Sequence, residues 1–192
     1  LASSKLVSSF PGAIECSKKN LERISNLKNT SDVIAVSKMP KELKYENDDK
    51  PIIYLENISD PGNFGNIIRS LDWFGFKNVF CSKNTVDQYN NKTIMASMGS
   101  IFRIQTHYIN YQEFRKKFSD HRLYISTLNG KNIKEVEFKK KAIMVIGSES
   151  RGVSDEIKND NHQAIKIPGM GKAESLNAGV ATGIILNEMI NG

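Results

Sequence analysis

The 192-residue chain is large enough for one domain, or for one domain with a small appendage. Its hydrophobic share of 39% and its charged share of 25% are ordinary for a globular protein and are not those of a disordered chain. Lysine and arginine number 27 against 21 acidic residues, and the net charge of +6 favours a polyanionic partner such as nucleic acid. Part of this excess lies in short lysine runs, which are equally compatible with solvated surface.

The sequence does not support a metal site, a membrane-spanning segment or a secretory signal. Cys16 and Cys81 lie far apart and the three histidines are scattered, so we expect no metal site and reduced thiols in a cytoplasmic protein. No segment approaches the roughly 18 apolar residues that span a membrane, and the first residues lack the apolar core of a secretory signal. The chain starts at Leu1 instead of methionine, so we expect a trimmed or partial chain.

Residues 1–47 differ in composition from the rest. Apolar residues at near-helical spacing predict a helix within 14–27, and DVIAV at 32–36 is a short β-rich run. The segment 38–51 is charged and carries two prolines, which is typical of a linker. We therefore place a domain boundary near residue 48.

After this boundary, predicted strands and helices alternate. Continuous apolar runs predict buried strands at 52–56, 78–82, 123–127 and 142–147. Helical patterns are predicted at 64–75, 92–102, 111–118 and 175–190. This alternation predicts an α/β fold with a mostly parallel sheet.

Three segments are rich in glycine and small polar residues: 58–70, 147–152 and 167–179. Loops after strands bind ligands in open α/β sheets, so each was compared with familiar motifs. Glu174 replaces the last glycine of a dinucleotide fingerprint, and Ala173 replaces the hydroxyl residue of a P-loop. Ser148 stands where a nucleophile elbow needs its first glycine. None of these nucleotide-binding or nucleophile motifs is present.

Glycines also occur inside the predicted final helix, at Gly179 and Gly183. Each glycine inside a helix costs about 1 kcal/mol relative to alanine. Close helix packing and the approach of a ligand or another backbone explain them equally well.

In order and spacing, DPGNFGNIIRSLDWFGF (60–76), IGSESRGVS (146–154) and IPGMGKAESLNAGVATGIILNE (167–188) resemble the three signature motifs of the SpoU (TrmH) group of SPOUT RNA methyltransferases. The resemblance covers about residues 51–190. It implies that residues 1–47 are the end of an amino-terminal RNA substrate-binding domain plus a linker, truncated in this chain. Residues 48–192 would be the SPOUT catalytic domain.

The resemblance also implies the fold in more detail. Family members have helices on both faces of a mostly parallel sheet and a carboxy-terminal deep trefoil knot. Chain passing through chain leaves little room for side chains. Five glycines would therefore suit close backbone approach: Gly147, Gly152, Gly169, Gly171 and Gly179.

In the family, S-adenosylmethionine lies bent in the knot and is held largely by main-chain groups. Matched by position, the residues that would line this site are Thr127, Leu128, Gly147, Ile167, Met170, Leu176 and Ala178. For Leu128, Ile167 and Leu176, ordinary core packing is an equally good explanation.

The implied reaction transfers a methyl group to a ribose 2′-hydroxyl in RNA. Arg69 matches the catalytic arginine of the family. Proton abstraction by arginine is chemically demanding, because its pKa exceeds about 12. We favour stabilisation of the developing alkoxide, or contact with a neighbouring phosphate, and leave base action open. The alternative is an ordinary salt-bridge arginine, and the pattern around it looks half-buried.

Four further polar residues match the motifs: Asn63, Glu149, Ser175 and Asn177. Asn63 would orient Arg69 or cap its helix, and Glu149 would brace the knot. Ser175 could equally cap the final helix, whereas Asn177, one turn in, has less structural reason. Family members often carry a serine where this chain has Gly179.

Family members act as homodimers, with the arginine supplied across the interface. We expect the glycines of DPGNFGN to form a tight turn at the catalytic crevice, with Arg69 pointing into it, and Ile185 and Met189 to lie at the interface. Ribosomal RNA is favoured over tRNA as the substrate. The alternatives are a catalytically silent RNA-binding homologue and a nucleotide-binding α/β protein of other chemistry.

Overall fold

The computed structural model describes residues 1–39, 45, 47, 50–148 and 150–192. The chain divides into two compact units, Leu1–Leu43 and Lys44–Gly192, which are described separately.

The first unit is small and contains a short 3-10 helix, η1 (Val7–Ser9), and one α-helix, α1 (Lys18–Ile24). Ser17 caps α1, because its hydroxyl accepts a hydrogen bond from the backbone N–H of Asn20. The predicted helix is present. The β-rich run at 32–36 forms only an isolated bridge between Val33 and Ala2, since the described part of the unit offers it no neighbouring strand.

The second unit is built on one six-stranded sheet with the order β3-β2-β1-β5-β4-β6, in which every neighbouring pair is parallel. The strands are β1 (Ile52–Leu55), β2 (Asn78–Cys81), β3 (Gln105–Tyr108), β4 (Arg122–Asn132), β5 (Ala142–Ile146) and β6 (His162–Lys166). The expectation of a mostly parallel sheet is confirmed.

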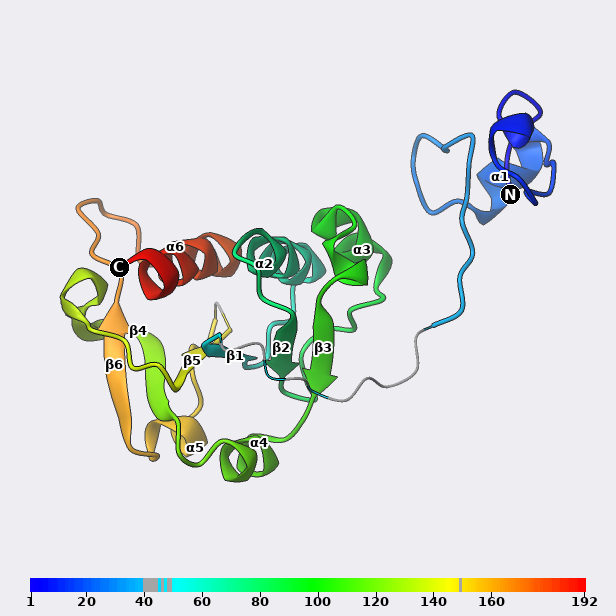
Figure 1. Cartoon of the computed structure of the whole chain (residues 1–192). Coiled ribbons are helices and arrows are strands. Elements are labelled where there is room, and N and C mark those ends of the chain that lie inside the picture. The colour runs from blue at the N-terminus through cyan, green and yellow to red at the C-terminus, as the bar shows by residue number, and fades with distance from the viewer. Residues whose placement is uncertain (40–44, 46, 48–49, 149) are drawn as a thin grey trace. The chain divides into compact units, whose positions relative to one another are not determined.

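Helices cover both faces of this sheet (Figure 1). They are α2 (Pro61–Trp73), α3 (Asn91–Ser97), α4 (Tyr111–Lys117), α5 (Asp155–Lys158) and α6 (Ala178–Asn191), with 3-10 turns η2 (Ser100–Phe102) and η3 (Ile133–Glu135). Among the described residues, no helix is both long and apolar enough to cross a membrane.

Alternate residues of the strands belong to two separate cores. In β1, Ile53 and Leu55 pack with α2 and α6, whereas Ile52 and Tyr54 pack with α4 and α5. Because successive side chains of a strand point to opposite faces, a strand buried on both faces is apolar throughout. This confirms the expected layers. The trefoil knot implied by the resemblance stays a prediction.

The buried side of α6 corrects one expectation. Ile185 is fully buried in the core with α2, and Met189 packs partly against the same core. Burying a side chain such as Ile185 contributes about 1.5–3 kcal/mol. The expectation that Ile185 is exposed at a subunit interface is therefore wrong.

The start of α2 also differs from expectation. The helix begins at Pro61, and the Asp60 carboxylate caps it by accepting the backbone N–H of Asn63 at 2.7 Å. The glycines of DPGNFGN are thus helical and do not form a tight turn. Gly65 is required because a Cβ there would lie 2.6 Å from Ala96 Cβ of α3. It allows α3 to pack closely on α2.

Candidate functional site

A cavity of about 700 Å³ lies beside the ends of β5 and β6 and a bulge in β4. Ser126 and Lys131 of β4 both pair with Ile165 of β6, so the residues between them leave the regular ladder. Gly130 makes the bulge possible, since a Cβ there would lie 2.5 Å from the Ile165 backbone. Gly130 was not among the predicted site residues, although Asn-Gly after a strand run is a turn signal.

The cavity, which we call the sheet-end cavity, is lined by all seven residues matched to the cofactor site and by Ser175. Leu128 is 68% exposed and Leu176 is 47% exposed, so core packing is the wrong explanation for these two side chains. Ile167 is half-buried and packs partly against the main core.

Thr127 lines this cavity and carries an unsatisfied polar atom. Its hydroxyl oxygen is buried and finds no hydrogen-bond partner among the described residues. An unpaired buried polar group costs about 1–3 kcal/mol.

Gly147 and Ser148, the first residues of the segment 147–154 that we call the second-motif loop, form one wall of the cavity. A Cβ on Gly147 would lie 2.2 Å from the carbonyl carbon of Gly152, and Gly152 has a φ of 65°. The Gly152 backbone N–H donates to the Ser148 carbonyl at 2.8 Å. The loop is thus closed backbone against backbone, as expected for Gly147. Glu149 lies outside the described residues.

Another wall is the third-motif loop, residues 167–177. It is exposed from Pro168 onward, and Met170 projects fully from it. A Cβ on Gly169 or Gly171 would meet no atom within 4 Å. The expectation that these two glycines allow close backbone approach is therefore wrong, because the loop lies away from the rest of the unit.

Asn177 joins the third motif to the first. Its side-chain oxygen accepts the N–H groups of Gly179 and Val180 at 2.9 and 3.3 Å, so Asn177 is the N-cap of α6. Its side-chain nitrogen donates to Asn63 Oδ1 at 2.7 Å. Ser175 as the cap of α6, and the view that Asn177 has little structural role, are both wrong. Asn63 is not a cap either, since Asp60 holds that position in α2.

Gly179 is tightly placed behind this cap. A Cβ there would lie 3.2 Å from both Asn66 Cβ and the side-chain oxygen of Asn177. The close approach expected at Gly179 is confirmed, and a serine at this position would crowd α2.

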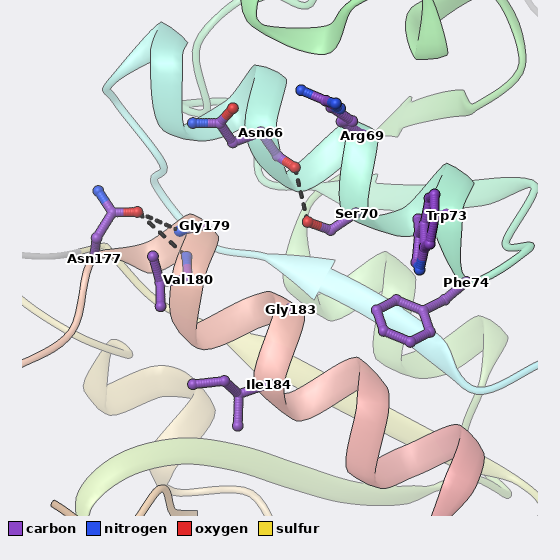
Figure 2. Close-up of a pocket in the computed structure, with 10 residues that line it drawn as sticks. All are labelled: Asn66, Arg69, Ser70, Trp73, Phe74, Asn177, Gly179, Val180, Gly183 and Ile184. Atoms are coloured by element: carbon purple, nitrogen blue, oxygen red, sulfur yellow. Dashed lines mark hydrogen bonds between the residues drawn. The ribbon is translucent and has the colours of Figure 1, made fainter.

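A second cavity, of about 600 Å³, lies between α2 and α6. Figure 2 shows its lining, with Arg69 and Trp73 on α2 and Val180 and Ile184 on α6. Trp73 is 85% exposed and Val180 is 53% exposed. We call it the inter-helix cavity.

Arg69 is exposed, not half-buried as its sequence setting indicated. Among the described residues it makes no hydrogen bond or ion pair, so the salt-bridge alternative is wrong within this chain. Asp72, one turn later, binds Arg103 instead, with 2.6 Å between Arg103 Nη2 and Asp72 Oδ2. The hydrogen bond from Arg103 lowers the pKa of Asp72, and burial opposes this only in part. The guanidinium of Arg69 is left free.

The first turn of α6 separates the two cavities. Ala178 and Ala181 line the sheet-end cavity, whereas Gly179 and Val180 line the inter-helix cavity. Arg69 therefore lies across this turn from the residues matched to the cofactor. In the part of the chain that the structure describes, no three His, Cys, Asp or Glu side chains are placed to hold a metal ion.

Comparisons with known proteins agree with this geometry. The family model of the SpoU rRNA Methylase family matches residues 50–187. A tRNA/rRNA methyltransferase of Archaeoglobus fulgidus, itself uncharacterised, is 36% identical over 70% of this chain, which spans 62% of that protein. The 23S rRNA (guanosine(2553)-2′-O)-methyltransferase RlmP of Bacillus subtilis is 27% identical over 95% of this chain and 75% of its own length.

Among solved structures, the AdoMet-bound rRNA methyltransferase of Sinorhizobium meliloti superposes with a TM-score of 0.69 and 29% identity. This match covers 73% of the present chain and 55% of the other. The shared sheet and the matched model together establish the family. The chain belongs to the SpoU rRNA Methylase family.

Proposed function

We propose that this chain is an S-adenosylmethionine-dependent RNA methyltransferase that methylates a ribose 2′-hydroxyl, with ribosomal RNA favoured over tRNA. One observation carries the proposal. The seven residues assigned to the cofactor by motif come from separate segments between Thr127 and Ala178, yet all of them line one cavity. The S. meliloti relative is AdoMet-bound, and the B. subtilis relative is a ribose 2′-O-methyltransferase of 23S rRNA.

The sheet-end cavity fits this cofactor. Its volume of about 700 Å³ lies within the usual range of roughly 300–1,000 Å³ for small-molecule sites. Thr127 offers an unpaired hydroxyl, and Leu128 and Leu176 offer exposed apolar surface. When bound, S-adenosylmethionine supplies an electrophilic methyl group on a sulfonium.

The chain's own residues would act on the hydroxyl that receives the methyl group. Arg69 is exposed and makes no hydrogen bond or ion pair among the described residues, so its positively charged guanidinium and its N–H donors are available to a substrate. We assign it the stabilisation of the developing alkoxide or of an adjacent phosphate, with proton abstraction as the alternative. The Asn63–Asn177 hydrogen bond would hold the starts of α2 and α6 in register. Ser175 would act beside the cofactor and Glu149 as a brace.

The inter-helix cavity is the surface that we propose a second copy of this chain covers. It exposes Trp73 and Val180 beside Arg69, so a homodimer would place Arg69 at a shared site. Trp73→Glu should therefore yield monomers and lower activity, measured by light scattering and methyl transfer. Phe102→Glu is the matched control, since Phe102 is 80% exposed but does not line the cavity. A dimeric Trp73→Glu protein would contradict this assignment.

The first unit and the location of the protein complete the proposal. We propose that residues 1–47 belong to the part of the protein that selects the RNA. The two cysteines of the chain, Cys16 in the first unit and Cys81 in β2, are both free, as is usual for a cytoplasmic protein.

The test is Arg69→Ala, assayed with labelled S-adenosylmethionine on ribosomal RNA and on tRNA. We expect kcat to fall by about 100-fold or more, as for other lost transition-state donors, and the Kd for S-adenosylmethionine to stay within about twofold. The control is Arg122→Ala. Arg122 lies at the start of β4, outside the residues that line either cavity, so this variant should keep wild-type activity. A fully active Arg69→Ala enzyme would remove Arg69 from the mechanism. Cofactor binding without any RNA methylation would favour the silent homologue.

A further inference from the structure

Glu56 follows β1 directly and is the one buried charged residue among those that the structure describes, with 6% of its surface exposed. A buried carboxylate is costly unless it is paired or hydrogen-bonded. Its side-chain oxygen Oε2 accepts the backbone N–H of Ser154 at 2.7 Å, from a residue 98 positions away in sequence. Such a charge-assisted hydrogen bond is about twice as strong as a neutral one.

The same residue also contacts the other end of the second-motif loop. The backbone N–H of Glu56 donates to the carbonyl of Ile146 at 2.9 Å, immediately before Gly147. Glu56 thus binds the chain where it enters the loop and again where it leaves at Ser154.

The backbone next to Glu56 is held by hydrogen bonds between Asn57 and Ser82, which follows β2. Asn57 has a φ of 55° in the left-handed region, and its backbone N–H donates to Ser82 Oγ at 2.9 Å. Ser82 Oγ donates in turn to the Asn57 side-chain oxygen at 3.2 Å. Because β1 and the segment after β2 hold this corner, the carboxylate of Glu56 is a rigid point of attachment.

A displacement at Ser154 would reach the cavity. Gly147 packs directly on Gly152, so the two ends of the loop have no free space between them. Gly147 and Ser148 line the sheet-end cavity.

We propose that Glu56 is a positioning residue that clamps the second-motif loop and so sets the affinity of the cavity for S-adenosylmethionine. This inference rests on the proposed function. Glu56 does not line the cavity and acts only through Ser154 and the loop. It therefore affects cofactor binding more than the chemical step.

Two pairs of variants separate the hydrogen bond from other effects. Glu56→Ala removes the acceptor, whereas Glu56→Gln keeps an oxygen at the same place. Ser154→Pro removes the donor at a φ of −66° that suits proline, whereas Ser154→Ala keeps the N–H and deletes a hydroxyl that has no partner in the described structure. The Glu56→Ala/Ser154→Pro double variant relieves any crowding between the carboxylate and the proline ring.

Titration calorimetry with S-adenosylmethionine should give a Kd raised roughly ten- to hundredfold for Glu56→Ala and for Ser154→Pro, the usual range for a lost hydrogen bond to a charged group. The double variant should be no worse than either single variant. Glu56→Gln keeps an acceptor but loses the charge, so its Kd should lie between those of the wild type and Glu56→Ala. Ser154→Ala should stay within about threefold, and kcat at saturating cofactor should change little. A folded Glu56→Ala protein with the wild-type Kd would overturn the proposal. If Glu56→Ala fails to fold, Ser154→Pro is compared with Ser154→Ala. Equal Kd values for these two variants would then overturn the proposal.

Hydrogen exchange keeps this test separate from the proposed function. In the free protein, the amides of 147–154 should exchange faster in Glu56→Ala than in the wild type, while those of α2 and α6 stay protected. If the amides of the loop exchange at the same rate in Glu56→Ala and in the wild type, Glu56 does not hold the loop and the proposal is wrong. If the wild-type protein binds no S-adenosylmethionine, the proposed function fails and this measurement alone decides the structural part.

Discussion

Two loops rich in glycine line the same cavity and are held in opposite ways. The second-motif loop (147–154) is closed by Gly147 packed on Gly152, by the Ser148–Gly152 hydrogen bond and by Glu56. The third-motif loop (167–177) is exposed, and among the described residues no backbone hydrogen bond reaches 168–176. The two loops look alike in sequence, but packing requires Gly147 and a φ of 65° favours glycine at Gly152, whereas Gly169 and Gly171 face open space.

This contrast suggests a division of labour. The second-motif loop is a wall that is already in place before a ligand arrives, which lowers the entropy cost of binding. The third-motif loop is free to fold onto a ligand, and Gly169 and Gly171 place few steric limits on its backbone. The following predictions test this difference.

The largest effect is expected for Gly147→Ala. The new Cβ would meet three backbone atoms within 2.5 Å, and backbone cannot move aside as a flexible side chain can. We expect the free energy of unfolding to fall by about 3 kcal/mol or more, measured by urea denaturation. Gly169→Ala is the matched control and should change stability by less than about 0.5 kcal/mol. Equal effects at the two glycines would remove the contrast.

Hydrogen exchange with S-adenosylhomocysteine should show the next largest effect. At a ligand concentration of 100 times Kd, binding stabilises the ligand-binding conformation by about 2.7 kcal/mol. Amides that exchange only when the site opens and the ligand leaves should therefore exchange more slowly. We expect this protection to be gained mainly in 167–177 and little in 147–154. Protection gained equally in both loops would mean that neither wall exists before the ligand binds.

Asn177→Ala is expected to act more weakly, where the third-motif loop joins α6. It removes the cap and the hydrogen bond to Asn63, and a lost N-cap costs about 1 kcal/mol of stability. Asn177→Ser keeps a capping hydroxyl but not the contact with Asn63. If capping explains the whole role of Asn177, the serine variant should have wild-type stability and methylation. Lower methylation in a stable serine variant would show that the Asn63 contact matters for the site.

Much of the fold could be predicted because its cause is local in sequence. The four apolar runs at 52–56, 78–82, 123–127 and 142–147 are strands, since only a sheet covered on both faces needs continuous apolar strands. β3 and β6 were missed because they lie at the two edges of the sheet, where half-buried and polar residues replace the apolar run. The four-residue helix α5 is too short for a helical period to be visible.

The seven residues matched to the cofactor site were proposed from the resemblance, and in the structure they all line one cavity. The details that failed depend on neighbours distant in sequence. Asp60, Asn63, Ser175 and Asn177 are all good caps by residue type, and only the three-dimensional ends of α2 and α6 show which of them act. Ile185 looked like an exposed apolar residue until the packing of α6 on α2 placed it in the core.

The most direct test of this account is calorimetric titration of the chain with S-adenosylmethionine and, separately, with S-adenosylhomocysteine. We place the cofactor in the sheet-end cavity, which lies within the second unit, so this test does not depend on the proposal that residues 1–47 help select the RNA. We expect both ligands to bind saturably, at about one molecule per chain. A folded protein that binds neither ligand would contradict it and leave RNA binding without catalysis as the better description.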